Sequence, residues 1–275
     1  MKRILVPTDF SDCAQNAADA AIGIAKRYGA EIHFYHFVSV PIDWIHIDFA
    51  QSTVYPDVTE EVDRVKAELN KLVKQAEAEG LQAVQYMDFD NSSDAVTNYA
   101  ERNNISMIVM GSHGAKGVKE FFIGSNAQMV VRNSEVPVLI VKDRLENLEI
   151  PNILFVSDFE DEMMRPFTHV VSFAQLMGAK IHLLYINTPS DFHRSWVIKE
   201  RMEAFIALAS TNLEEAEIED SYTFEEGIEQ YCEHNVTGLL AIATHHRKGL
   251  SRAFLGSLTE KVVNHVKVPV VSFPI

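Results

Sequence analysis

Three glycines and a predicted helix start in the first half of the sequence could together hold a phosphate group. Gly111 and Gly114 follow a run of apolar residues, and Gly124 directly precedes Ser125 and Asn126 at the expected start of a helix. Glycine lets backbone N–H groups approach an anion closely, and the amino end of a helix favours negative charge. This spacing therefore predicts a site in which main-chain amides bind phosphate.

The strands and helices that must position these glycines follow from the apolar pattern of the first half. Apolar runs without polar alternation predict buried strands, and apolar positions three and four apart predict helices between them. Alternating strands and helices predict a parallel sheet covered on both faces, and right-handed crossovers give a doubly wound domain of five strands. The predicted strands are 3–6, 31–38, 83–87, 106–110 and 136–141, and the predicted helices run from Ser11 or Asp12 to Gly29, from 59 to 80, from Ser92 or Ser93 to 103, and from 124 to 132.

The second half of the chain repeats the first in the same order. A shift of 132 residues superimposes Gly124-Ser125 on Gly256-Ser257, and the last apolar runs of the two halves also coincide. The two beginnings match as well, with Ile4-Leu5-Val6 echoed by Ile153-Leu154-Phe155. Ordered matches of this kind predict a tandem duplication. We expect a first domain over residues 1–145 and a second over 150–275, each with the same doubly wound fold.

The glycines of the first copy have a structural alternative, which is that they only form a tight turn between strand and helix. The second copy must make the same turn, yet it places Ala243 opposite Gly111 and His246 opposite Gly114. This difference predicts a separate role for the first-copy glycines and one bound phosphate ligand per chain. A weaker anion site in the second copy stays open, because its loop keeps the basic residues Arg247, Lys248 and Arg252.

Composition and charge exclude several classes of partner. The 275 residues include 24 Lys and Arg against 39 Asp and Glu, a net charge of −15, which argues against binding of nucleic acid. The apolar fraction of 47% is ordinary for a globular protein. No apolar run approaches the roughly 18 residues of a membrane-spanning helix, so no membrane association is expected.

Targeting signals and metal-ligand patterns give a second set of exclusions. The amino terminus has three apolar residues before Pro7, short of the roughly 7–15 of a signal-peptide core, so we expect a cytoplasmic location. Cys13 and Cys232 form no closely spaced pair, and His33 and His36 lie three apart on a predicted strand and therefore point to opposite faces. The sequence predicts neither a disulfide nor a metal site.

The glycine spacing resembles the nucleotide-binding signature of universal stress proteins. The signature reads Gly111-x2-Gly114-x9-Gly124-Ser125, and the segments Val6–Ser11 and Val136–Val141 also resemble that family. Because the resemblance covers nearly the whole chain as two copies, the sequence is similar to a tandem universal stress protein. The resemblance implies two Rossmann-like domains of the adenine nucleotide alpha hydrolase-like type.

The same resemblance implies a ligand and a role for each site residue. The ligand is expected to be ATP, an adenine nucleotide, and Mg²⁺ is a candidate companion of its phosphates. Asp9 has an alternative role as the cap of the first helix. By the resemblance, the adenosine end would contact Pro7, Thr8 and Asp9, the base would meet Phe37, the ribose and phosphates would be held by Met110, Gly111 and Gly114, and the phosphates would also contact Gly124, Ser125 and Asn126.

The sequence favours a binding protein over an enzyme. It contains no Gly-x4-Gly-Lys loop and no nucleophile elbow, and the adjacent residues Ser112 and His113 are not expected to aim their side chains at each other. We therefore predict an ATP-binding regulatory protein of the stress response, without catalytic residues. A weak ATPase, an autophosphorylating enzyme and a nucleotide-free scaffold are the alternatives.

Two further expectations concern assembly. The resemblance implies that the last strands of the halves, Val136–Val141 and Val268–Phe273, could pair inside the chain and make an internal pseudo-dimer, which would also cover an exposed sheet edge. Association of two chains into a homodimer stays open. The long aromatic connection over 41–57 fits either a flap over the nucleotide or a partner surface, and the pattern does not choose between them.

Overall fold

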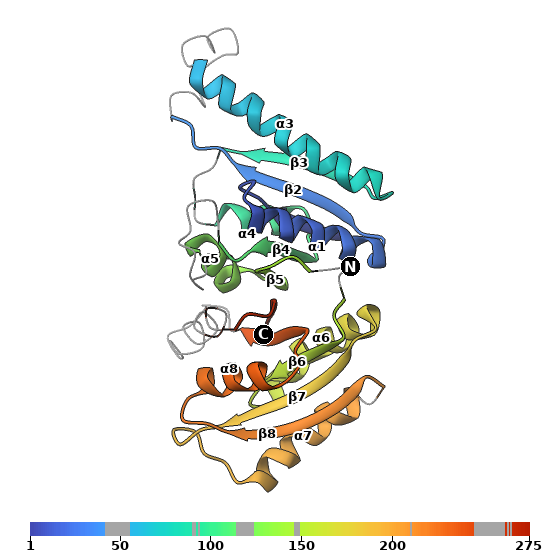
Figure 1. Ribbon diagram of the computed structural model, residues 1–275, viewed down its shortest axis with the longest axis vertical. Helices are drawn as coiled ribbons and strands as arrows, with labels where there is room; N and C mark the ends of the chain where they lie inside the picture. Colours follow the sequence, from blue (N-terminus) through green and yellow to red (C-terminus); the bar gives the residue numbers. More distant parts are fainter. Residues whose placement is uncertain are drawn as a thin grey trace.

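Among the residues that the structure describes, ten strands form one continuous sheet that extends through both halves (Figure 1). The order of the strands is β3-β2-β1-β4-β5-β10-β9-β6-β7-β8, so each half of the chain contributes five neighbouring strands. This computed structural model describes residues 1–41, 56–89, 92, 94–113, 124–145, 149–209, 211–244, 262, 264 and 266–275. The predicted connection over 41–57 and the second-copy loop with His246 and Gly256 lie almost wholly outside the described residues.

The first half is a doubly wound parallel sheet, as predicted. Helices α1 and α3 pack on one face of its strands, whereas α4 and α5 pack on the other. All four strand pairs within this half are parallel. The elements are β1 (Arg3–Pro7), α1 (Asp12–Tyr28), β2 (Glu31–Phe37), α3 (Pro56–Ala78), β3 (Ala83–Asp88), α4 (Ala95–Arg102), β4 (Met107–Gly111), α5 (Ser125–Asn133) and β5 (Val138–Val141).

The second half repeats this arrangement. Helices α6 and α7 cover the face that α1 and α3 cover in the first half, and α8 covers the other face. The elements are β6 (Asn152–Val156), the 3₁₀ turn η3 (Asp161–Met163), α6 (Met164–Met177), β7 (Lys180–Asn187), α7 (Ser195–Ala209), β8 (Leu213–Asp220), α8 (Phe224–His234), β9 (Leu239–Thr244) and β10 (Val270–Pro274).

The predicted boundaries of α1 are confirmed, whereas the predicted starts of α3 and α4 are not. Ser11 caps α1, because its side chain accepts a hydrogen bond from the backbone N–H of Ala14 at 3.2 Å, and α1 ends at Gly29 with φ of 63°. Two expected starts were wrong. Helix α3 begins three residues early at Pro56, whose fixed φ suits a first helical turn, and α4 begins after Asp94 and not after a serine.

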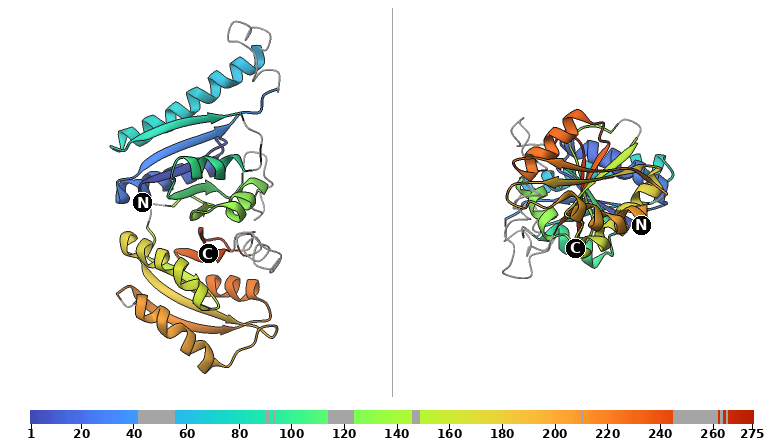
Figure 2. Two further views of the ribbon diagram at one scale, coloured as in Figure 1. Left: turned by 180° about the vertical axis from the view of Figure 1, so that it is seen from behind. Right: turned by 90° about the horizontal axis from the view of Figure 1, so that it is seen from below.

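The two halves meet edge to edge, which confirms the predicted internal pseudo-dimer. Strands β5 and β10 pair antiparallel, with Val271 opposite Leu139. Across the same seam the guanidinium of Arg27 donates to the carbonyl oxygen of Met177 at 3.0 Å. Figure 2 shows the halves stacked along the long axis, with both chain termini near the seam.

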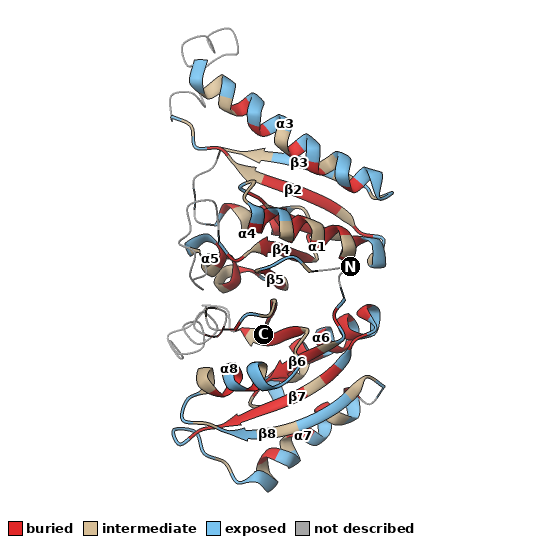
Figure 3. Cartoon of the chain, viewed as in Figure 1, coloured by how far each residue is buried: buried red, intermediate tan, exposed pale blue. Residues whose placement is uncertain are grey.

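Buried residues concentrate on the central strands and on the inward faces of the helices (Figure 3). One cluster of buried side chains on the α1 and α6 face contains residues of both halves. Within the described residues, we find no helix with the length and apolar character needed to cross a membrane.

Candidate functional site

The carboxyl ends of β1, β2 and β4 lie side by side, and they bring several predicted site residues to one edge of the sheet. Strand β1 lies between the other two and ends at Pro7. Phe37 is the last residue of β2, and Gly111 is the last residue of β4. Met110 precedes Gly111 on β4 and is largely buried. In open parallel sheets, this edge is where ligands bind.

The chain turns sharply after β1. The Oγ1 of Thr8 accepts from the backbone N–H of Phe10 at 3.0 Å, and Asp9 accepts from the N–H of Ser11 at 3.1 Å. Asp9 thus lies just before the helix and is exposed, while Ser11 makes the cap. Phe10 has φ of 62°, a left-handed conformation that is uncommon for a bulky residue.

His36 holds this turn from the neighbouring strand. Its Nδ1 lies 2.7 Å from the carbonyl oxygen of Thr8, and its ring stacks on Phe10 with centroids 4.6 Å apart and planes inclined by 25°. A carbonyl oxygen only accepts, so Nδ1 carries the proton. Burial lowers the pKa of the His36 imidazole, which keeps the ring neutral at pH 7.

The amino end of α5 lies beside the end of β4. The N–H of Gly124 donates to the carbonyl oxygen of Ser112 at 2.7 Å, which closes the loop between them. Gly124 has no side chain to cap the helix, and Ser125 and Asn126 are exposed. Gly114 lies outside the described residues.

Gly111 has a packing role that the sequence did not reveal. A Cβ at this position would lie 2.9 Å from the Cys13 sulfur and 3.0 Å from two backbone atoms of Cys13. Helix α1 can therefore approach β4 closely only because residue 111 is glycine. The second copy carries Ala243 on β9 and begins its helix region with the short turn η3.

The expectation that the side chains of Ser112 and His113 would not aim at each other is wrong. The Oγ of Ser112 lies 3.0 Å from Nδ1 of His113 and 3.7 Å from the Cys13 sulfur. The chain bends as it leaves β4, and this bend lets neighbouring side chains turn toward each other. Ser112 is only 4% exposed, so its hydroxyl is packed beneath the edge and not presented to a substrate.

At the matching edge of the second half, several side chains bond to the segment that follows β7. Asn187 accepts from the N–H of His193 at 3.0 Å and donates to Asp220 at 2.9 Å. Arg201 on α7 pairs with Glu160 at 2.8 Å and lies 3.3 Å from Nε2 of His193. We call these five residues the clamp. It fixes the segment 188–194 against the ends of β6 and β7.

A second contact fills the place that corresponds to Phe37. The repeat puts Ile186 at that place, and Ile186 is 6% exposed. It packs so tightly on α8 that a Cβ at Gly227 would lie 2.7 Å from it. Phe37 in the first half is only partly buried.

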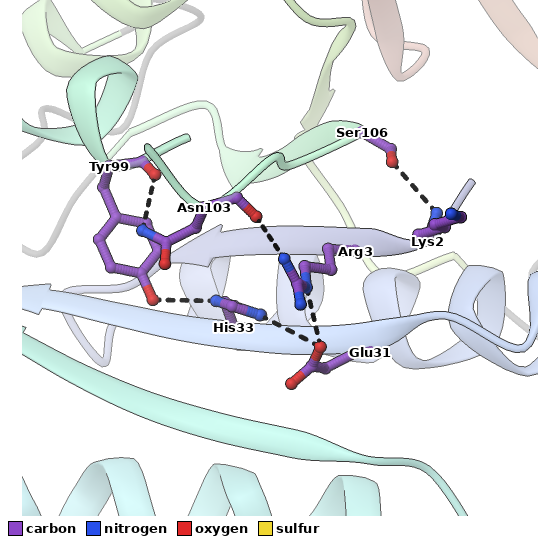
Figure 4. A network of polar contacts seen from close by, with 7 residues as sticks. All are labelled: Lys2, Arg3, Glu31, His33, Tyr99, Asn103 and Ser106. Carbon is purple, nitrogen blue, oxygen red and sulfur yellow. Dashed lines mark hydrogen bonds and ion pairs between the residues drawn. The ribbon is translucent and has the colours of Figure 1, made fainter. Parts of the chain in front are cut away.

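A polar network at the opposite edge of the first half serves the fold (Figure 4). Arg3 pairs with Glu31 at 3.0 Å and donates to the carbonyl oxygen of Asn103 at 2.8 Å. Nδ1 of His33 lies 2.9 Å from the hydroxyl of Tyr99, and its Nε2 lies 3.6 Å from the Glu31 carboxylate. Burial lowers the pKa of the His33 imidazole. The network joins the starts of β1 and β2 to the α4–β4 connection.

His33 and His36 have different partners on opposite faces of β2, as their spacing predicts. His33 packs beside Tyr99 of α4, and His36 packs beside Phe10. Among the residues that the structure describes, no three His, Cys, Asp or Glu side chains gather as a metal site would require.

The sequence and fold agree with a known family. The model of the Universal stress protein family matches two regions of the chain, residues 1–142 and 149–274. The chain therefore belongs to the Universal stress protein family, with two copies of the family's domain.

Individual relatives cover either half or all of the chain. Universal stress protein MJ0531 of Methanocaldococcus jannaschii is 32% identical over 142 residues, which are 51% of this chain and 82% of that protein. Universal stress protein Slr1230 of Synechocystis is 22% identical over 293 residues and covers 99% of this chain and 100% of its own length. The crystal structure of a universal stress protein from Archaeoglobus fulgidus superposes with a TM-score of 0.76 at 22% identity, over 99% of this chain and 98% of that chain. This last likeness supports the two-domain fold.

Proposed function

We propose that this chain is an ATP-binding regulatory protein of the stress response that acts in the cytoplasm. The first domain, residues 1–145, would hold the nucleotide, and the second, residues 150–275, would be mainly structural. ATP would bind at the edge formed by the ends of β1, β2 and β4, with Mg²⁺ as a candidate companion of the phosphates. Binding would stabilise one conformation of the first domain. The difference in ATP affinity between two conformations would set how far ATP shifts their populations.

The observation that carries this proposal is the position of α5. Among the described residues, no side chain of the N-cap residue caps its amino end, which is joined to the end of β4 by the hydrogen bond from Gly124 to Ser112. Ser125 and Asn126 are exposed there. Backbone amides in such a position suit a phosphate group. The glycine spacing Gly111-x2-Gly114-x9-Gly124 supports the same conclusion.

The adenosine end has a separate set of candidates. Thr8 and Asp9 follow β1, and Phe37 ends β2, so all three border the same edge. A base stacked against Phe37 would gain contact with an aromatic ring. Met110 and Gly111 lie between this end and α5 and are the candidates for the ribose.

The two halves differ in a way that favours the first. The clamp and the packed Ile186 occupy the second-half positions that correspond to the adenosine end. A nucleotide there would have to displace these internal hydrogen bonds. At the first-half edge, the described residues include the exposed Asp9 and the partly buried Phe37.

The proposal is tested by calorimetric titration of the purified chain with ATP and Mg²⁺. We expect about one nucleotide per chain. Asp9→Asn should weaken ATP binding about tenfold, because a charged hydrogen-bond partner is lost, while Asp158→Asn at the matching position of the second half should leave it unchanged. Gly114→His, which introduces the residue of the second copy, should abolish binding with the fold retained. Absence of ATP binding by the wild-type chain would support the scaffold alternative, and turnover of ATP would support the enzyme alternative.

A further inference from the structure

We infer that His36 is a positioning residue for the nucleotide site, which fixes the turn Thr8–Phe10 that the adenosine end would meet. This inference rests on the proposed function, because it assigns a device to the same site. His36 lies on β2 next to Phe37, yet its side chain points to the turn after β1.

Two contacts of one imidazole hold two successive parts of this turn. The Nδ1–H donates to the carbonyl oxygen of Thr8 at 2.7 Å, which sets the direction of the peptide that leads into Asp9. The ring face stacks on Phe10 at 4.6 Å, which holds the side chain that follows Asp9. Asp9 therefore lies between two residues that His36 restrains.

The turn needs such a restraint because its backbone is strained. Phe10 adopts φ of 62°, a left-handed conformation that is unfavourable for a residue with a bulky side chain. Strain of this kind persists only where surrounding contacts determine the conformation. The two internal hydrogen bonds from Phe10 to Thr8 and from Ser11 to Asp9 shape the turn, and His36 ties it to β2.

The second half has the same strained turn, and there too the residue at the His36 position stacks on the phenylalanine, since the ring centroids of Tyr185 and Phe159 lie 6.5 Å apart and the rings are inclined by 26°. Phe159 has φ of 54°, but it is 2% exposed and packs in the core, with its ring centroid 5.1 Å from that of Phe205. Tyr185 occupies the place of His36, and its hydroxyl contacts His193 of the clamp at 3.2 Å. The second half thus buries Phe159 and leaves Asp158 partly exposed, whereas the first half keeps Asp9 exposed and ties the turn to β2 through the hydrogen bond between His36 and Thr8.

The experiment compares four forms of the full chain: wild type, His36→Leu, His36→Asn and His36→Gln. Asparagine places its amide N–H where Nδ1–H lies, whereas glutamine places it near Nε2. Tyr185→Leu is the matched control in the second half. Each form is titrated with ATP and with inorganic triphosphate, and its unfolding midpoint is measured.

We expect His36→Leu and His36→Gln to weaken ATP binding about tenfold and His36→Asn to stay within about threefold of wild type. Inorganic triphosphate, which would contact α5 and not the turn, should bind all forms within about twofold, and Tyr185→Leu should bind ATP like wild type. Equal ATP affinity in wild type and His36→Leu would overturn the inference, as would equal affinity in the Asn and Gln variants. An equal loss for ATP and triphosphate would assign His36 a general structural role and also overturn it. Absence of ATP binding by the wild-type chain would instead contradict the proposed function.

Discussion

At the scale of single residues, Gly111 shows that a residue of a ligand motif can be required by packing alone. Its Cα faces Cys13 of α1 so closely that no Cβ fits without displacement. The glycine brings the first turn of α1 against β4, and both elements border the candidate site. The packing role and the proposed ligand role are compatible, because both need backbone without a side chain.

Gly111→Ala should lower the free energy of unfolding by about 1–3 kcal/mol, the usual cost of an added methyl group in a packed core. Two of the three close contacts are to the Cys13 backbone, so Cys13→Ala should restore only part of the loss. Urea unfolding measures both effects. Ala243→Gly at the matching position is the control, because it measures the effect of exchanging alanine and glycine on backbone entropy. A Gly111→Ala chain as stable as wild type would contradict the packing explanation.

His33 gives the first half a dependence on pH. Burial lowers its pKa in the folded chain below the ordinary value of 6.5, so the unfolded chain binds more protons between these two values. The contribution of neutral His33 to the free energy of unfolding is therefore fully present above pH 6.5. It is lost as the pH falls from 6.5 toward the pKa of His33 in the folded chain. His36 shifts in the same direction for the same main reason.

We therefore expect the free energy of unfolding to fall between pH 7.5 and pH 5.5, and to fall less in His33→Gln. A double variant with His36→Asn should show a still smaller dependence. Urea unfolding at the two pH values measures the slopes. Identical slopes in wild type and His33→Gln would rule out a contribution from this buried imidazole.

At the scale of elements, corresponding strands and helices of the two copies make different contacts. The segment after β7 is fixed by the clamp, and a short antiparallel bridge joins Thr188 to Asp191 within it. Helix α7 contributes Arg201 to the clamp, whereas its counterpart α3 presents Glu61 and Arg64 as an exposed pair at 2.6 Å. The described residues thus place a candidate binding edge in one copy and the clamp at the matching edge of the other.

Arg201→Met should loosen the clamp without unfolding α7. The loss of about one hydrogen bond predicts roughly fivefold faster amide exchange of His193 and its neighbours in 188–194. Hydrogen exchange measured by mass spectrometry reports this segment separately from β6. Lys199→Met on the same helix is the control, and unchanged protection in Arg201→Met would show that the segment is held by other contacts.

The sequence predicted the elements well and the contacts between distant elements poorly. The order of strands and helices followed from apolar spacing. The pairing of the last strands followed from the family resemblance, and its antiparallel direction was not predicted. The packing of Gly111 on Cys13, the meeting of Ser112 with His113, the clamp and the restraint of Phe10 by His36 could not be predicted. Each of these depends on the distance between side chains or elements, which periodicity does not report. The sequence did contain one indication of a role for His36. It is a polar residue within a largely apolar strand, and such a residue usually has a hydrogen-bond partner in the fold.

At the scale of the whole molecule, the seam makes one sheet out of two domains. Val271 and Leu139 face each other across β5 and β10, and both are fully buried. Arg27 adds a hydrogen bond from α1 to the end of α6. The shared core on the α1 and α6 face indicates that the halves stabilise each other.

Val271→Asp places an unpaired charge at this seam and should lower the free energy of unfolding by at least about 3 kcal/mol. Val236→Asp is the matched control, because Val236 is 81% exposed. Calorimetry measures both changes. Equal stability of the two variants would contradict the view that the seam holds the halves together.

The outer edges of the sheet differ in charge. Strand β8 carries five carboxylates over Leu213–Asp220, whereas β3 carries only the Asp88 carboxylate. Repulsion between carboxylates opposes edge pairing of β8 with a second copy. The five carboxylates of β8 thus have one counterpart on β3.

The central claim is that one ATP binds at the ends of β1, β2 and β4 and not at the matching edge of the second half. A crystal structure of the chain grown with ATP and Mg²⁺ tests this most directly. We predict a nucleotide whose phosphates lie at the amino end of α5 beside Ser125, with its adenosine end at Thr8, Asp9 and Phe37. A nucleotide bound beside Ser257, with nothing bound at Ser125, would contradict the claim.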